Sequence, residues 1–249
     1  MKEYLVVLFY IADEAQGEEI SLAIEGWRKH FKEKFRLVVI GDNPHINGIE
    51  YMIVDRISEK DGEYRPHLDI CNKLRLACTM YGDSYDGFIW ASDDFFAVND
   101  FTFADVIAPK YQDEEMPPTG DRHPNPWVRN LVKTRHLCDA EGYGIVNWIT
   151  HLPLYFECEK LMSVIRDYDL TKDSYIVENI YFNKFVPEGK AEKLSINDRW
   201  KFGVYFTPLD ICGLMNAFAN KIWVCCSVNG WSESLATELK KHYGINTSL

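Results

Sequence analysis

Short, nearly continuous apolar runs recur along the first hundred residues, and each one ends at polar or glycine-containing positions. A run of this kind is typical of a strand that is buried on both faces of a sheet. The pattern predicts strands at Tyr4–Ile11, Arg36–Ile40, Tyr51–Val54 and Gly87–Ala91.

Between these runs, apolar residues recur every three or four positions, which is typical of amphipathic helices. Two segments show this spacing, residues 20–31 and Leu68–Met80. Strands that alternate with helices predict an α/β fold with a mostly parallel sheet flanked by helices. Ligands of such sheets bind beyond the carboxyl ends of the strands. We therefore expect the polar stops at Asp42 and Asp93–Asp94 to share one edge of the sheet.

The second half of the chain has a different pattern of residues, because it begins with a proline-rich segment. Residues 109–126 contain five prolines, and we expect them to form a long loop over the site. No Gly/Ser linker or repeat follows, so the pattern predicts a single domain over residues 1–249. The further elements expected are helices at Trp127–Ala140, Glu157–Tyr168, Ser174–Phe185 and Glu233–Tyr243, and strands at Tyr143–Ile149 and Ile222–Val228.

The charge of the chain limits its partners. It carries 27 Lys and Arg against 38 Asp and Glu, a net charge of −11. This balance argues against nucleic acid and against anionic membrane surfaces, both of which are bound through basic side chains. No apolar run approaches the length of a membrane span. The seven cysteines include no CxxC pair, so we expect reduced thiols in a cytoplasmic protein.

Asp93 and Asp94 directly follow the predicted strand Gly87–Ala91 and are the strongest chemical signal. Two adjacent carboxylates repel each other, and a hard divalent cation offsets that repulsion. Mn²⁺ or Mg²⁺ favours one or two carboxylates together with phosphate oxygens. The alternative is an ordinary turn, in which Asp is common.

Other candidate residues have equally plain structural readings. Asp42 is placed to contact a nucleoside or to make an Asx-turn before Pro44. His151 follows the strand predicted at Tyr143–Ile149. It is either a metal ligand or a buried histidine whose ring nitrogens find hydrogen-bond partners in the core. Lys73 reaches a diphosphate or faces solvent. Glu178 is an acid or base, or lies on a solvated helix face.

Several motifs are absent from the sequence. It contains neither a Walker A loop nor GxGxxG, which disfavours P-loop and dinucleotide-binding proteins. It also lacks GxSxG and HExxH.

Taken together, four segments resemble GT-A-fold nucleotide-sugar glycosyltransferases, including bacterial and phage glycosyltransferase-like proteins and the Stealth sugar-phosphate transferases. GFIWASDDFF is similar to the strand that ends in the family's Asp-X-Asp metal motif, with Ser92 in place of the first acid and Asp94 at the metal-coordinating acid. The tail Ser227–Gly230 also fits loosely. The segments are the opening strand and helix followed by RLVVIGDNP, the helix containing Asn72-Lys73-Leu74, GFIWASDDFF (87–96) and THLPLYF (150–156).

The resemblance implies transfer of a sugar from a nucleotide sugar, with UDP expected, to a hydroxyl of a glycan or another acceptor. Residues 1–108 would form the nucleotide-binding half and residues 109–249 the acceptor side, shaped by the proline-rich loop, Trp127, Trp148 and Trp200. Asp93, Asp94 and His151 would hold Mn²⁺ or Mg²⁺, and Glu178 would be the base. Tyr10, Ala12, Asp42, Lys73 and Asp93 would contact the nucleotide.

Three alternatives remain open from the sequence. A Stealth-type enzyme would transfer a sugar phosphate, breaking a bond within the diphosphate. A non-catalytic module would bind nucleotides or glycans without turnover. A structural protein would carry only a vestigial acidic motif.

Overall fold

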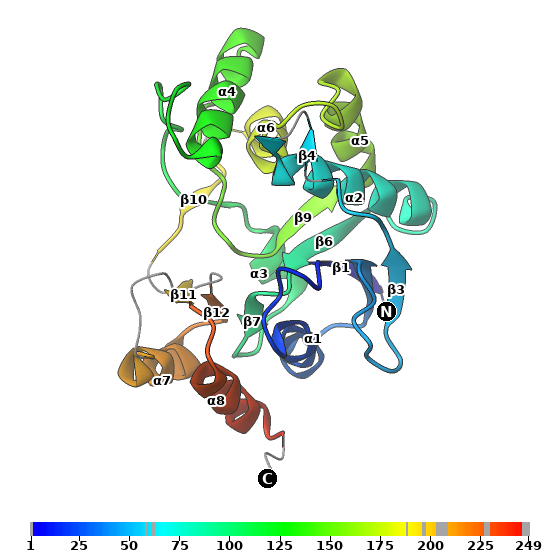
Figure 1. Cartoon of the computed structure of the whole chain (residues 1–249), viewed down its shortest axis with the longest axis vertical. Helices are drawn as coiled ribbons and strands as arrows, with labels where there is room; N and C mark the ends of the chain where they lie inside the picture. The colour runs from blue at the N-terminus through cyan, green and yellow to red at the C-terminus, as the bar shows by residue number, and fades with distance from the viewer. Residues whose placement is uncertain are drawn as a thin grey trace.

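The computed structural model describes residues 2–57, 59–60, 63–187, 189–195, 198–202, 209–226 and 230–245 (Figure 1). Its centre is a five-stranded sheet in the order β3-β2-β1-β6-β9. The first four strands are parallel, and β9 is antiparallel to β6. The fold is therefore α/β with a mixed, mostly parallel sheet, as the sequence predicts. The strands are β1 (Tyr4–Tyr10), β2 (Phe35–Gly41), β3 (Glu50–Ile53), β6 (Gly87–Ser92) and β9 (Leu154–Glu157).

The apolar run of β1 is buried on both faces because helices cover both sides of the sheet. Leu5, Val7 and Phe9 pack on one side with α2, α4, α5 and α6, and Val6 and Leu8 pack on the other side with α1. Figure 1 shows these helices on opposite sides of the sheet. The helices are α1 (Glu19–His30), α2 (Pro66–Tyr81), α4 (Pro126–Glu141), α5 (Cys158–Asp167) and α6 (Val177–Phe185).

A small second sheet joins the C-terminal part of the chain to β7 and packs against α1. Its order is β11-β12-β7, with β12 parallel to β11 and antiparallel to β7. Phe96 and Val224 of this sheet pack with Leu22 and Ala23 of α1, and α7 and α8 join the same cluster. The elements are β7 (Phe95–Ala97), β11 (Arg199–Phe202), β12 (Trp223–Cys226), α7 (Ile211–Asn220) and α8 (Glu233–Tyr243).

Short elements complete the described chain. They are α3 (Phe103–Ile107), the pair β8 (Lys110–Tyr111) and β10 (Glu192–Lys193), and the pair β4 (Glu59–Lys60) and β5 (Glu63–Tyr64).

The prediction of a strand at Tyr143–Ile149 is wrong. The segment forms one isolated bridge, between Asn147 and Asp113. Side chains of α6 take its backbone groups: Asn179 Oδ1 accepts from Trp148 N at 2.7 Å, and Asn183 bonds both N and O of Val146. With these groups satisfied, no neighbouring strand is needed. The strand next to β6 is β9, which follows Pro153.

Most other predicted elements are confirmed to within a few residues. The prediction at Ile222–Val228 corresponds to β12 as far as Cys226, while residues 227 and 228 lie outside the described residues, as does most of the tail 227–230. The sequence did not indicate β7, β9 or α7.

Candidate functional site

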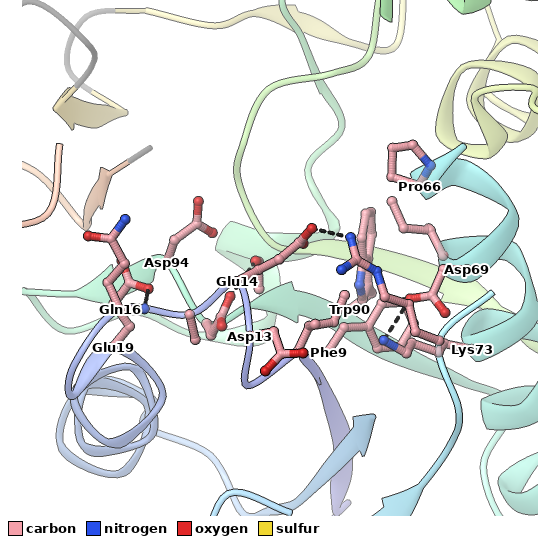
Figure 2. A pocket seen from close by; sticks show the side chains of 16 residues that line it. Phe9, Asp13, Glu14, Gln16, Glu19, Pro66, Asp69, Lys73, Trp90 and Asp94 are labelled. Carbon is pink, nitrogen blue, oxygen red and sulfur yellow. Dashed lines mark hydrogen bonds and ion pairs between the residues drawn. The ribbon is translucent and has the colours of Figure 1, made fainter. Parts of the chain in front are cut away.

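A cavity of about 690 Å³ lies beyond the carboxyl ends of β1 and β6 (Figure 2). Asp42 follows β2 and Asp93–Asp94 follows β6, and both strands pair with β1 in parallel. The expectation that these polar stops share one edge of the sheet is therefore confirmed. Carboxylates dominate the cavity wall, which carries Asp13, Glu14, Glu19, Asp69, Asp93 and Asp94 against the two cations Arg56 and Lys73.

Asp94 and Glu19 lie at one end of the cavity, as Figure 2 shows. Burial, the Asp94 carboxylate and Glu19 together raise the pKa of Asp93 to about 8, although Ser92 Oγ donates to Asp93 Oδ1 at 3.1 Å. Burial also raises the pKa of Glu19, and Asp94 adds to this effect. The crowded carboxylates therefore repel one another in a partly desolvated space.

The C-terminal strand β12 helps to hold this acidic end. Cys226 N donates to the backbone carbonyl of Asp94 at 3.2 Å. Cys226 Sγ donates to Glu19 Oε1 at 3.3 Å, and Glu19 Oε2 accepts from Gln16 N at 2.7 Å. The backbone of Asp94 and the carboxylate of Glu19, from distant parts of the chain, are thereby held at one strand end.

Lys73 and Asp69 form the opposite end, one turn apart on α2. Lys73 Nζ lies 2.7 Å from Asp69 Oδ2, and the two side chains are 1% and 4% exposed. Asp69 Oδ1 also accepts from Ile57 N at 2.9 Å. The structure therefore places Lys73 in the cavity, and not toward solvent, with its charge balanced by Asp69.

Between these ends, Arg56 pairs with Glu14, and Trp90 lines the wall. The Trp90 indole Nε1 is buried and donates to no acceptor among the described residues. An N–H group of this kind is costly to bury unless a ligand accepts from it.

The donor set fits a hard divalent cation. Asp93 and Asp94 supply carboxylate oxygens. Burial first, and then the negative charge of Asp94 and Glu19, raise the pKa of Asp93, and a bound cation would offset that repulsion. In the described part of the chain, no three His, Cys, Asp or Glu side chains are arranged as a ready metal site. Ligand oxygens would have to complete the coordination.

Of the five predicted nucleotide contacts, Lys73 and Asp93 line the cavity. Tyr10, Ala12 and Asp42 do not line it and lie next to lining residues at its rim. Asp42 Oδ2 accepts from Ala12 N at 2.7 Å, which ties the turns after β1 and β2 together. The Asx-turn is made by Asn43, whose Oδ1 accepts from His45 N. Burial and then the charges of the nearby Asp93 and Asp42 raise the pKa of Tyr10.

Two predicted residues are not brought to the cavity. His151 does not line it, and its ring meets the Phe95 ring edge-on at 6.5 Å between centroids. Glu178 is 5% exposed and belongs to α6, where burial raises its pKa to about 7. The roles of these residues as metal ligand and base remain predictions.

The expected acceptor side also lies apart from the cavity. The proline-rich segment 109–126 contributes nothing to its lining, and bonds from Gln112, Asp113 and Met116 tie that segment to residues 145–147. Trp148 is 3% exposed, Trp127 stacks near His67, and the side chain of Trp200 lies outside the described residues.

Sequence reasoning missed most of the cavity wall. Asp13 and Glu14 follow β1 as Asp93 and Asp94 follow β6, so the same rule of strand ends would have indicated them. Asp69 stands four residues before Lys73, at the spacing of a helix ion pair. Arg56, Trp90 and the contribution of Cys226 carry no local signal, because long-range packing places them.

A scan against protein-family models finds no match, and a search of curated proteins finds none either. Among the described residues, no helix is both long and apolar enough to cross a membrane.

Proposed function

We propose that this chain is a metal-dependent glycosyltransferase that moves a sugar from a nucleotide sugar, with UDP expected, to an acceptor hydroxyl. The supporting observation is the acidic cavity beyond the ends of β1 and β6, with Asp93 and Asp94 directly after β6. Its volume of about 690 Å³ lies within the usual range for small-molecule sites. The resemblance to GT-A-fold enzymes supports the same function.

The charge of the cavity supports dependence on a metal. A diphosphate would be repelled by six carboxylates that face only two cations. Asp93 and Asp94 would hold Mn²⁺ or Mg²⁺, and the donor's diphosphate oxygens would complete the coordination. When bound, the cation supplies Lewis-acid stabilisation of the negative charge on the departing diphosphate.

The chain's own side chains would orient the donor. The Trp90 indole Nε1 would donate a hydrogen bond to an oxygen of the nucleotide sugar. Lys73 and Arg56 would add positive charge to the same wall of the cavity. In the reaction, the bond from the anomeric carbon to the diphosphate breaks and a bond from that carbon to the acceptor oxygen forms. The acceptor hydroxyl proton passes to a base.

Calorimetric titration of UDP, with GDP and CDP for comparison, tests the site with Mn²⁺ and with a chelator. We expect UDP to bind wild type only with Mn²⁺, and Asp94→Asn to weaken binding at least tenfold. Asp83→Asn is the matched control, since Asp83 is exposed and does not line the cavity. Its affinity should stay within twofold of wild type.

The outcomes separate the alternatives. Absence of nucleotide binding under every condition refutes the proposal. Release of UDP on turnover of a UDP-sugar supports glycosyl transfer, whereas release of UMP indicates sugar-phosphate transfer. Metal-independent binding without turnover indicates a binding module.

A further inference from the structure

A second cavity, of about 260 Å³, lies between the N-terminus of α2, the face of α4 and the segment before α6. Arg129, Asn130, Lys133 and His136 share one face of α4, at intervals of three or four residues. Arg65 adds a further cation from the residue before α2, and Asp121, Asp173 and Ser174 complete the polar lining.

Cations outnumber carboxylates in this cavity, although the whole chain carries −11. Asp173 pairs with Lys133, and its Oδ1 lies 3.9 Å from Arg65 Nη1. His136 Nδ1 lies 3.9 Å from Asp121 Oδ1. The basic side chains of Arg65, Arg129 and Lys133 face two acids, so the formal charge of the cavity lining is positive.

Two features indicate that the cavity is built for a ligand. Arg129 Nη1 donates to the carbonyls of His123 at 2.8 Å and Pro124 at 3.1 Å, so its guanidinium is fixed in place. Ser174 is 4% exposed, and its Oγ has no hydrogen-bond partner among the described residues. A buried hydroxyl beside cations is a donor ready for an anionic oxygen.

Neighbouring residues at the start of α2 line the two cavities. Arg65 lines the second cavity, and the next residue, Pro66, lines the acidic one. His67 then packs on Trp127 of α4, with ring centroids 4.9 Å apart. A molecule that occupies the second cavity therefore lies near the Pro66 edge of the acidic cavity, where the nucleotide sugar would bind.

We propose that this second cavity binds a phosphoryl group of the acceptor substrate, so that the enzyme glycosylates a phosphorylated sugar or glycan. The proposal rests on the proposed function. Arg129 and Lys133 hold the phosphoryl oxygens, Ser174 Oγ donates to one of them, and the acceptor's sugar extends toward the donor cavity.

Calorimetric titration with inorganic phosphate, a hexose 6-phosphate and the unphosphorylated hexose tests this site. A chelator and low salt keep the acidic cavity free of metal and limit screening. We expect both phosphate compounds, and not the hexose, to bind wild type. The double variant Arg129→Gln/Lys133→Gln should weaken both at least tenfold.

Matched variants distinguish the loss of a specific binding site from a general loss of positive charge and from misfolding. Arg28→Gln/Lys241→Gln removes two exposed cations on α1 and α8 and should stay within twofold of wild type. Ser174→Ala removes only the unpartnered hydroxyl and should weaken phosphate binding about threefold to tenfold. Near-UV circular dichroism verifies the fold of each variant.

Three results would overturn the proposal: unchanged phosphate binding in the Arg129/Lys133 variant, equal weakening in the Arg28/Lys241 variant, or binding of inorganic phosphate without hexose 6-phosphate. UDP binding with Mn²⁺, measured on the same proteins, should be unchanged. Absence of UDP binding in wild type would instead refute the proposed function and with it the role of an acceptor, while phosphate binding that the Arg129/Lys133 variant loses would still establish the second cavity as an anion site.

Discussion

Gly41 shapes the rim of the acidic cavity through its backbone. It ends β2 with φ of +136°, a backbone conformation that residues other than glycine rarely adopt. A Cβ at this position would lie 1.9 Å from the carbonyl oxygen of Tyr10 and 3.3 Å from Lys73 Nζ. The turn that carries Asp42 therefore depends on the absence of a side chain at residue 41.

Gly41→Ala should lower the free energy of unfolding by about 2 kcal/mol or more, because both the backbone conformation and the collision are unfavourable. Gly48→Ala is the control, since Gly48 also has positive φ, +74°, but open space around it. It should cost about 1 kcal/mol. Urea unfolding measures both, and equal losses would show that the contact with Tyr10 is unimportant.

Glu178 gives a pH-dependent stability. Burial raises its pKa from 4.5 to about 7, the neighbouring group is Cys71 of α2, and Oε2 has no hydrogen-bond partner among the described residues. The folded state therefore binds this proton more tightly than the unfolded state does. Stability from this group is present below pH 4.5 and is lost as the pH rises toward 7.

Glu178→Gln should remove that loss. The melting temperature of the variant relative to wild type should rise between about pH 4.5 and 7 and then level off. Thermal melts across this range measure the difference. A difference independent of pH would contradict the raised pKa.

At the scale of elements, periodicity and apolar runs predicted the parts of the fold that depend on local pattern. The strands β1, β2, β3 and β6 and the helices α1, α2, α4 and α8 follow the pattern closely. The segment 143–149 does not, because its partners are the side chains of Asn179 and Asn183 on α6 together with the irregular backbone of residues 112–116. Such side-chain pairing leaves no periodic signal in the segment itself.

Asn179→Ala should therefore destabilise the protein by about 1–3 kcal/mol, since it leaves the buried N–H of Trp148 without its acceptor. Asn220→Ala is the matched control, because the Asn220 amide is exposed and, among the residues that the structure describes, bonds only to Asn216 of the same helix. It should change stability by less than about 0.5 kcal/mol. Denaturant titration distinguishes the two, and a similar effect for both would refute the assigned role of Asn179.

The candidate site was predictable to the same extent as the fold. Asp93 and Asp94 were found because a polar stop after a buried strand is a local signal. Glu19 lies in the first turn of α1, and only the tertiary fold brings it to Asp94. Glu178 and His151 were attractive residue types, but their elements hold them away from the cavity wall.

At the scale of the whole molecule, the C-terminal part completes the N-terminal half. β12 pairs with β7, and Val224, Leu235 and Leu239 pack with Phe96 and Leu22. All the charged residues that line the acidic cavity, in contrast, precede residue 95. The cavity's chemistry and its support therefore come from opposite ends of the sequence.

A chain cut after Asn220 should fail to unfold cooperatively, because this apolar cluster would lose β12 and α8. The expected signs are weak near-UV circular dichroism and binding of a hydrophobic dye. A cooperative transition at the melting temperature of the whole chain would show that the C-terminal part is dispensable for the fold.

The hydrogen bond from Cys226 to the Asp94 carbonyl has a consequence for biosynthesis. A ribosome makes Asp94 long before Cys226, so until Cys226 has been added the nascent chain carries its acidic rim without the strand that anchors it. The rim is fixed only after β12 has been made and has joined β7. The proposed binding of a metal and a nucleotide should then arise only after β12 has been made, and translation products that stop before Cys226 should lack it.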